Sequence, residues 1–225
     1  MKSFAVVALA SVALAAPNCD ISTIDKCLKK ALPYSNRTSL GVTPEEIEKE
    51  CKCDREAIAC LLDYAESGCV KGDTELALRI TIRGAAEESA LRCQKGTARN
   101  ADYLKYVSCV NKAGPKLNKC FRDTTSYIET AGRGGVGTGL PQGCCALGRL
   151  STCIGGAAAA ECGADAEMYV KNVFTGILGN FLDKSCGAYQ AMSEKCQSIE
   201  ILKTEGEPKF FTPVGAFFDI VKNEM

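Results

Sequence analysis

CKCDREAIACLLDYAESGC (residues 51–69) is matched by CCALGRLSTCIGGAAAAEC (residues 144–162), with cysteines at the first, tenth and last positions of both stretches. The match extends to one further cysteine on each side. It then comprises two sets of five: Cys27, Cys51, Cys60, Cys69 and Cys93, and Cys120, Cys144, Cys153, Cys162 and Cys186. Each member of the second set lies 93 residues after its counterpart. A fixed offset kept by five cysteines predicts an internal duplication.

Apolar residues recur at helical spacing in each copy, and no stretch alternates convincingly as a strand. In the first copy we expect helices over residues 19–32, from Thr43 towards Cys69, and over 73–93. In the second copy we expect helices over 102–128, with a break near Gly114-Pro115, and over 144–162 and 164–186. The predicted fold is all-α: a disulfide-rich helical protein built from two tandem three-helix repeats.

One helix start is especially clear. In Thr43-Pro44-Glu45-Glu46, threonine is a capping residue, proline fits the first turn, and Glu46 completes a capping box. We divide the chain into a signal peptide (1–15), repeat 1 (16–100), repeat 2 (101–198) and a C-terminal tail (199–225). Whether the tail phenylalanines (Phe210, Phe211, Phe217 and Phe218) dock on the body or stay mobile is left open.

The first residues predict secretion. Lys2 precedes an apolar run from Phe4 to Leu14, and Ala13-Leu14-Ala15 has the small-x-small form of a cleavage site. This run is too short for a membrane anchor, and no later stretch is long and apolar enough to span a bilayer. Without Lys2, 26 basic and 27 acidic residues remain, so nucleic acid is not an expected partner. We therefore predict a secreted, extracellular protein.

All 15 cysteines follow the signal peptide, and in an oxidising compartment they predict disulfides. We assign Cys109 as the last cysteine of copy one and Cys196 as the last of copy two. Copy two then lacks a counterpart of Cys19, because the offset points to Lys112. The expected framework contains Cys19, Cys27, Cys51, Cys53, Cys60, Cys69, Cys93, Cys109, Cys120, Cys144, Cys153, Cys162, Cys186 and Cys196. Cys145 is the expected unpaired thiol, and if exposed it would link two chains in a homodimer.

The chain has no histidine, which excludes Ser-His-Asp and Cys-His catalysis and histidine-ligated zinc. The acidic pairs Glu45-Glu46 and Glu87-Glu88 are interpreted as solvated helix faces. The glycine-rich residues 132–137 lie between two expected helices, so we interpret them as a linker and not as a dinucleotide-binding loop. Cysteines strung along helices favour disulfides over a thiolate metal cluster. We predict no enzyme activity, no catalytic or cofactor-binding residues, no metal site and no cofactor.

Two features bear on binding and modification. Asn36-Arg37-Thr38 is a glycosylation sequon, which places Asn36 on an exposed loop. The last helix of copy two carries a broad apolar stripe, and Phe174, Ile177 and Phe181 are its candidate ligand-facing residues. Such a stripe is more often core than pocket.

Part of the chain resembles a family of secreted arthropod haemolymph glycoproteins, the 27 kDa glycoprotein-like family. The similar parts are Cys51-Lys52, residues 56–61 (EAIACL), and then Cys69, Cys93, Cys109 and Cys120 in order. They cover about a third of the chain, and Cys53 and the fully spaced second copy depart from the pattern. The resemblance implies a helical secreted protein without an assigned activity, and it carries over no site residues. A secreted cysteine-rich nematode family is the second resemblance.

Two function classes stay open at this stage. One is an extracellular carrier of an apolar small molecule or lipid, which a cavity above roughly 300 Å³ would favour. The other is a structural or interaction protein of haemolymph, venom or extracellular matrix with a macromolecular partner. A solid core with an exposed apolar patch would favour that alternative.

Overall fold

The computed structural model describes residues 19–204 and 206–222. The predicted signal peptide, residues 1–15, lies outside the described residues. The described chain is all-α and disulfide-rich, as predicted, and contains no strand. Its elements are α1 (Ser22–Ala31), α2 (Pro44–Glu66), α3 (Gly72–Cys93), α4 (Ala98–Val110), the 3-10 turn η1 (Asn111–Ala113), α5 (Gly114–Gly132), α6 (Val136–Cys162), α7 (Ala164–Ser185), α8 (Glu194–Ser198) and α9 (Pro213–Val221).

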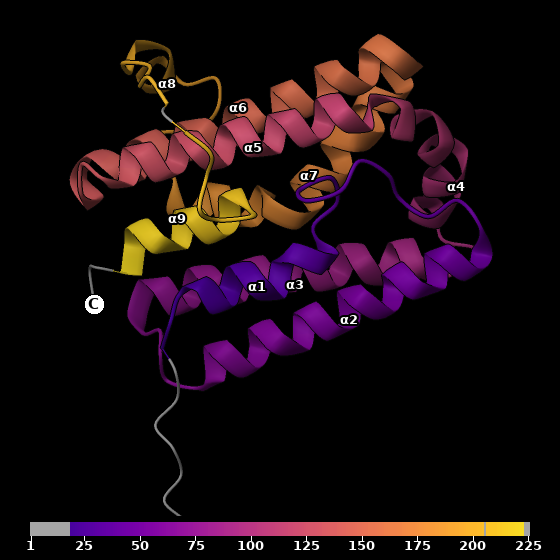
Figure 1. Ribbon diagram of the computed structural model, residues 1–225, viewed down its shortest axis with the longest axis horizontal. Helices are drawn as coiled ribbons and strands as arrows, with labels where there is room; N and C mark the ends of the chain where they lie inside the picture. The colour runs from indigo at the N-terminus through magenta and orange to yellow at the C-terminus, as the bar shows by residue number, and fades with distance from the viewer. Residues whose placement is uncertain (1–18, 205, 223–225) are drawn as a thin grey trace, which may run out of the picture.

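The helices form two groups joined by α4 (Figure 1). The first half consists of α1, α2 and α3, and the second consists of α5, α6 and α7. The principal contact between the halves is α3 against α7, while α9 packs against α5, α1 and α6. No helix within the described ranges has the length and apolar character that crossing a bilayer requires.

Local sequence explains where the helices begin. The Thr43 side chain accepts a hydrogen bond from the backbone N–H of Glu46, and the Glu46 carboxylate accepts one from the backbone N–H of Thr43. The capping box predicted for α2 is therefore confirmed. The expected break at Gly114-Pro115 is also confirmed, because α4 ends at Val110 and α5 begins at Gly114 with proline in its first turn.

The glycine-rich linker is shorter than we predicted, because α6 begins at Val136 and not at Cys144. Its glycines allow close helix packing. A Cβ atom on Gly139 would lie 3.1 Å from the Ala131 carbonyl oxygen, and one on Gly143 would lie 3.1 Å from the Phe217 ring. The glycines therefore let α6 approach the end of α5 and the C-terminal helix α9.

The C-terminal tail docks on the body. Phe217 and Phe218 of α9 are buried, and Phe217 meets Phe181 edge to face at 5.2 Å between ring centroids. Asp25 of α1 fixes the start of α9 by accepting hydrogen bonds at 2.8 Å from the backbone N–H groups of Phe211 and Thr212. The tail is thus part of the core, although Phe211 itself remains exposed.

Seven disulfides join the described cysteines. Four of them form two equivalent pairs, in which one bond from each half has the same sequence separation. They are Cys27–Cys60 and Cys120–Cys153, separated by 33 residues, and Cys51–Cys93 and Cys144–Cys186, separated by 42. A third disulfide in each half joins a cysteine at or just after the end of the middle helix (α2 or α6) to a cysteine that comes before the first helix (α1 or α5). In the second half, this earlier cysteine lies in α4. These bonds are Cys19–Cys69 and Cys109–Cys162.

The assignment of Cys109 to the end of the first copy is wrong. Cys109 bridges Cys162 of α6, so it takes the part in the second half that Cys19 takes in the first. Cys19 precedes Cys27 by 8 residues, whereas Cys109 precedes Cys120 by 11. The three-residue turn η1 lies in that interval and accounts for the displacement from the fixed offset.

The assignment of the odd thiol to Cys145 is also wrong. Cys145 bridges Cys196 of α8, and Cys53 of α2 is the unpaired cysteine. The offset of 93 makes Cys145 the counterpart of Lys52, one position before Cys53. One residue turns a helical side chain by about 100°. Cys145 is therefore buried facing α8, whereas Cys53 is half-buried on α2.

Candidate functional site

A cavity of about 140 Å³ lies between the two halves. Its walls come from both halves and from α9, and most of the lining side chains are apolar, including Leu61 of α2, Leu150 of α6 and Val214 in the first turn of α9. Phe174 and Ile177, two of the three candidate ligand-facing residues of α7, line it. Phe181 does not line it, because this ring points into the aromatic cluster with Phe217 and Phe218.

Two glycines set the spacing of the helices beside the cavity. A Cβ atom on Gly84 of α3 would overlap the carbonyl oxygens of Gly176 and Ile177 on α7. A Cβ atom on Gly176 would lie 2.5 Å from the Glu88 Oε2 atom. Gly84 therefore permits the close crossing of α3 and α7, and Gly176 leaves room for the Glu88 carboxylate.

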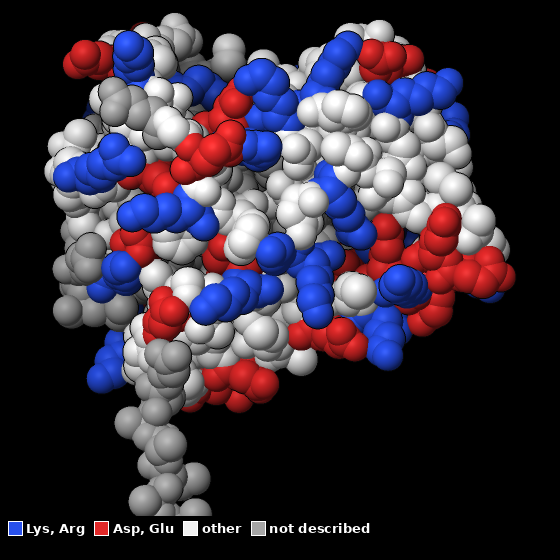
Figure 2. Space-filling model, viewed as in Figure 1, with Lys and Arg blue, Asp and Glu red and all other residues white. Residues whose placement is uncertain are grey.

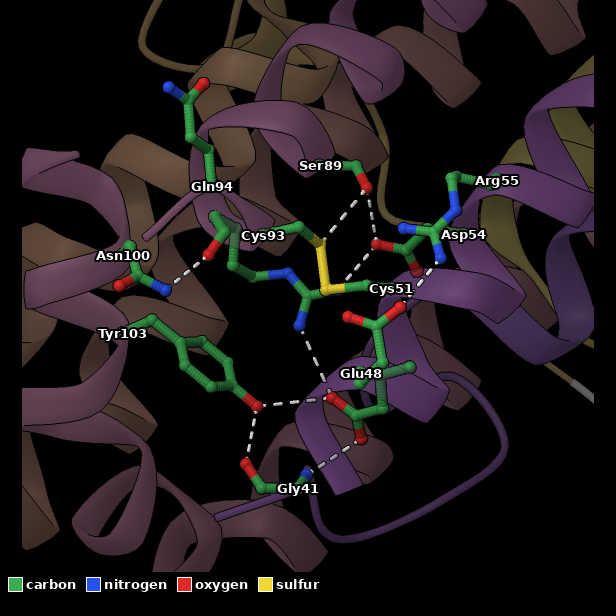
Figure 3. The surroundings of a disulfide bond; sticks show 12 residues. Gly41, Glu48, Cys51, Asp54, Arg55, Ser89, Cys93, Gln94, Asn100 and Tyr103 are labelled. Atoms are coloured by element: carbon green, nitrogen blue, oxygen red, sulfur yellow. Dashed lines mark hydrogen bonds and ion pairs between the residues drawn. A yellow bond between two sulfur atoms is a disulfide. The ribbon is translucent and has the colours of Figure 1, made fainter. Parts of the chain in front are cut away.

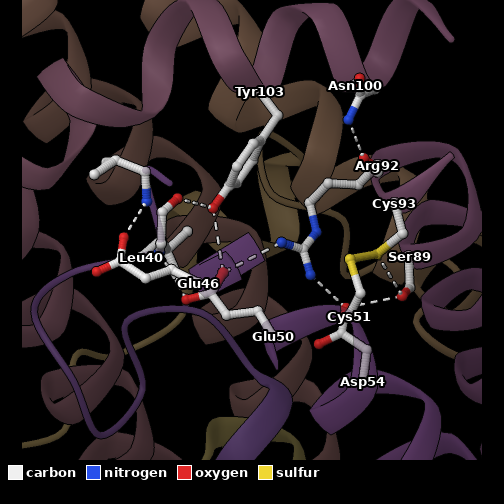
Figure 4. Close-up of polar contacts among 12 residues, drawn as sticks. Leu40, Glu46, Glu50, Cys51, Asp54, Ser89, Arg92, Cys93, Asn100 and Tyr103 are labelled. Atoms are coloured by element: carbon white, nitrogen blue, oxygen red, sulfur yellow. Dashed lines mark hydrogen bonds and ion pairs between the residues drawn. A yellow bond between two sulfur atoms is a disulfide. The ribbon is translucent and has the colours of Figure 1, made fainter. Parts of the chain in front are cut away.

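One end of the cavity is polar, and Arg92 of α3 is the centre of its charged network. The Arg92 guanidinium lies between two α2 carboxylates: Nη2 is 2.5 Å from Asp54 Oδ2, and Nη1 is 3.4 Å from Glu50 Oε2 (Figure 4). The Ser89 hydroxyl donates to the same Asp54 oxygen at 2.8 Å. Asp54 and Ser89 lie beside the Cys51–Cys93 disulfide (Figure 3), so the bridge holds the two charged helix faces together.

The network continues into α4 and into the loop before α2. The Tyr103 hydroxyl lies 3.2 Å from Glu50 Oε2 and donates to the Gly41 carbonyl oxygen at 2.7 Å. The backbone N–H of Gly41 donates to Glu50 Oε1 at 2.8 Å, and Arg37 pairs with the same oxygen at 3.1 Å. Buried charges need such partners, because an unpaired one loses its hydration without compensation.

A second ion pair stands beside the first. Glu88 of α3 lines the cavity at 5% exposure, and its Oε1 atom is 2.6 Å from Arg99 Nε of α4. Neither atom has hydrogen-bond geometry with any group among the described residues. The nearby Tyr169 of α7 is 9% exposed and stacks on Tyr106 at 5.4 Å between ring centroids.

Burial is the first cause of the pKa shifts at this end. It raises the pKa of the Glu88 carboxyl above its usual range, against the opposing effect of the Arg99 and Arg92 charges. It also raises the pKa of the Tyr103 and Tyr169 hydroxyls, so both stay protonated at neutral pH. Burial opposes the charge on Arg92, but Asp54 outweighs it and raises the pKa of Arg92.

The remaining candidate residues lie at the surface or apart from the cavity. Asn36 is exposed on the loop between α1 and α2, and Glu45 and Glu46 are exposed at the start of α2. Our interpretation of Glu88 as part of a solvated face is wrong: Glu87 is exposed, but Glu88 turns inward towards α7 and α4. Within the part of the chain that the structure describes, no three acidic or cysteine side chains are grouped to hold a metal ion.

Sequence reasoning missed Asp54, Arg92 and Tyr169. A signal for the first two was present, since Asp54 lies three residues after Cys51 and Arg92 directly precedes Cys93, and charged residues rarely face a disulfide-bridged helix interface without a partner. Tyr169 was not among the residues of the apolar stripe predicted for α7, and its hydroxyl gave no separate signal. No protein-family profile, curated protein or solved structure matches this chain.

Proposed function

We propose that this protein is a secreted, non-enzymatic carrier that binds a small apolar molecule in the cavity between its two halves. The observation that carries the proposal is the cavity itself, which is bounded mainly by apolar side chains from both halves and from α9. Seven disulfides and the lack of a bilayer-spanning helix in the described ranges are in keeping with secretion.

The volume of about 140 Å³ limits the ligand. It does not reach the roughly 300 Å³ that we expected of a carrier and that is typical of drug-sized ligands, so a lipid with two acyl chains is too large. An apolar cavity of about 150 Å³ in another protein takes up benzene or xenon. We therefore propose a ligand about the size of one aromatic ring or a short alkyl chain.

Thermal unfolding with benzene as the probe tests the proposal. A ligand at about 100 times its dissociation constant stabilises the folded protein by about 2.7 kcal/mol, so benzene is expected to raise the melting temperature. Ala57→Leu places extra volume in the cavity wall and should abolish the rise. Ala59→Leu makes the same change on the exposed side of α2 and should keep it. No rise with the unaltered protein would overturn the proposal.

The alternative is a structural or interaction protein, and the half-buried Cys53 thiol favours it in one form, a disulfide-linked homodimer. Acidic and basic side chains are interspersed on the face shown in Figure 2, so that face offers no single-sign surface for a partner. A covalent dimer on non-reducing electrophoresis that Cys53→Ser abolishes would support this alternative.

Three further expectations belong with this proposal. The recurring disulfide separations support an origin of the two halves by duplication. The exposed position of Asn36 supports glycosylation there, which a mass shift on glycosidase treatment would test. Membership of the arthropod haemolymph glycoprotein family stays a proposal that rests on residues 51–52 and 56–61 and on the order of the cysteines that follow.

A further inference from the structure

The polar end of the cavity contains two groups whose hydrogen-bonding capacity is unused. Tyr169, which is 9% exposed, lines the cavity, and its hydroxyl has no hydrogen bond to any described residue. Glu88 Oε1 also lacks a hydrogen bond, because the Arg99 N–H group at 2.6 Å is not directed at it. Buried polar atoms are rarely left without partners, so the Glu88 Oε1 atom calls for an explanation.

The charges at this end are balanced. Arg92 pairs with Asp54 and Glu50, Arg37 pairs with Glu50, and Arg99 pairs with Glu88. Three guanidinium groups therefore stand against three carboxylates. An anionic ligand would meet the Glu88 and Asp54 carboxylates without a free cation, and an ammonium would approach the Arg92 and Arg99 guanidinium groups.

We infer that the ligand carries a single uncharged hydroxyl group, held between the Tyr169 hydroxyl and the Glu88 carboxylate, with its apolar part towards Val173 and Ile177. A ligand hydroxyl donates one hydrogen bond and accepts others, so it can donate to Glu88 Oε1 and accept from Tyr169. The ligand class is then a small alcohol or phenol rather than a hydrocarbon, a fatty acid or an amine. This inference rests on the proposed carrier function.

Four probes of similar size separate these classes: ethylbenzene, benzyl alcohol, benzylammonium and benzoate. Their affinities are measured by titration calorimetry at neutral pH. Ethylbenzene and benzyl alcohol should both bind, because the rest of the cavity is apolar. Benzylammonium and benzoate should bind at least about 10-fold more weakly than benzyl alcohol, because each buries a charge without a free partner.

Tyr169→Phe removes only the hydroxyl. It should weaken benzyl alcohol binding by about 3- to 10-fold, the range expected for one hydrogen bond, and leave ethylbenzene binding unchanged. Tyr106→Phe is the matched control, since Tyr106 stacks on Tyr169 but does not line the cavity, and it should alter neither affinity.

The outcomes separate the two proposals. If none of the four probes binds, the carrier function itself fails. If ethylbenzene binds but benzoate or benzylammonium equals benzyl alcohol, only the inference about the hydroxyl group is overturned. An equal loss for ethylbenzene and benzyl alcohol in Tyr169→Phe overturns it as well, because the hydroxyl would then act only in packing.

Discussion

The two halves of the molecule share their disulfide frame but differ in what fills it. Both place a bridge of separation 33 between the first and second long helices and a bridge of separation 42 between the second and third. Around its bridge of separation 42, the first half buries the charged network in which Arg92 pairs with Asp54. At the positions 93 residues later, the second half has Ser185 and Leu147.

Neighbouring elements complete each half differently. Glu88 corresponds by the same offset to Phe181, which packs on Phe217 and Phe218 of α9. In the first half, Tyr103 of α4 adds its hydroxyl to the charged network. The comparison indicates that covalent bridges hold the helix positions while the residues between them change from charged to aromatic.

Asp25 in α1 and Asn118 in α5, which are 93 residues apart, also differ in chemistry at an equivalent position. Asp25 accepts hydrogen bonds from the backbone of the C-terminal tail. Its counterpart Asn118 donates hydrogen bonds to the carbonyl oxygens of Tyr34 and Ser35, at 2.9 and 3.0 Å. The equivalent position therefore anchors a neighbouring loop in both halves. The carboxylate of Asp25 accepts from N–H groups in the first half, and the amide of Asn118 donates to carbonyl groups in the second.

The largest effect is expected from breaking the charged network of the first half. Arg92→Met leaves the buried Glu50 and Asp54 carboxylates without their shared cation, and the free energy of unfolding should fall by about 3–5 kcal/mol. The combined variant Glu50→Met, Asp54→Leu, Arg92→Met removes all three charges and should recover part of the loss, because Arg37 and the Gly41 N–H lose their acceptor Glu50. Denaturant unfolding measures both. A loss below about 1 kcal/mol for Arg92→Met would contradict the account, because the charged network would then not stabilise the first half.

Removing equivalent disulfides should cost equal stability. Cys51→Ala with Cys93→Ala, and Cys144→Ala with Cys186→Ala, each open a bridge of separation 42, and each pair should lower the free energy of unfolding by about 2–4 kcal/mol. Equal losses would support the shared frame. Losses that differ by more than about 1 kcal/mol would show that the interiors, and not the bridges, set the stability of each half.

Asp25→Asn should lower the free energy of unfolding by about 1–3 kcal/mol, because the amide NH₂ group would face the Phe211 N–H and leave it unpaired. Burial raises the pKa of Asp25 in the folded protein. Its titration therefore contributes most stability below the ordinary aspartate pKa of about 3.9, and this contribution is lost as pH rises through the folded value.

The stability difference between the unaltered protein and Asp25→Asn should accordingly shrink between pH 4 and pH 7, as followed by thermal unfolding. A difference that grows over this interval would contradict the pKa direction. Asn118→Asp supplies the control for the second half: it turns a donor into an acceptor against two carbonyl groups, so it should also destabilise.

The smallest effect is expected at the odd cysteine. Cys53→Ser should change the free energy of unfolding by less than about 0.5 kcal/mol, because Cys53 is half-buried and is the cysteine without a bridge. Cys145→Ser should cost more, since it opens the bridge to Cys196. Alkylation of the unreduced protein followed by peptide mapping should label Cys53. A label on Cys145 would restore our original assignment.

Much of the helical frame could be predicted from sequence, because periodicity, caps and cysteine spacing are local signals. The pairing of Cys109 could not, since three extra residues at η1 shift it from the fixed offset. Glu88 faces inward because Gly84 and Gly176 let α3 and α7 cross closely. This contact joins distant parts of the chain, so no local signal predicts it. The site was therefore predicted only in part: Phe174 and Ile177 from the stripe of α7, but not its polar end.

Native mass spectrometry of the protein isolated from its source, without organic solvent, tests the carrier function most directly. The account predicts a monomer that holds one small uncharged molecule, which is released on unfolding and contains a hydroxyl group. A bare monomer that also fails to take up benzyl alcohol or ethylbenzene when they are added would contradict it.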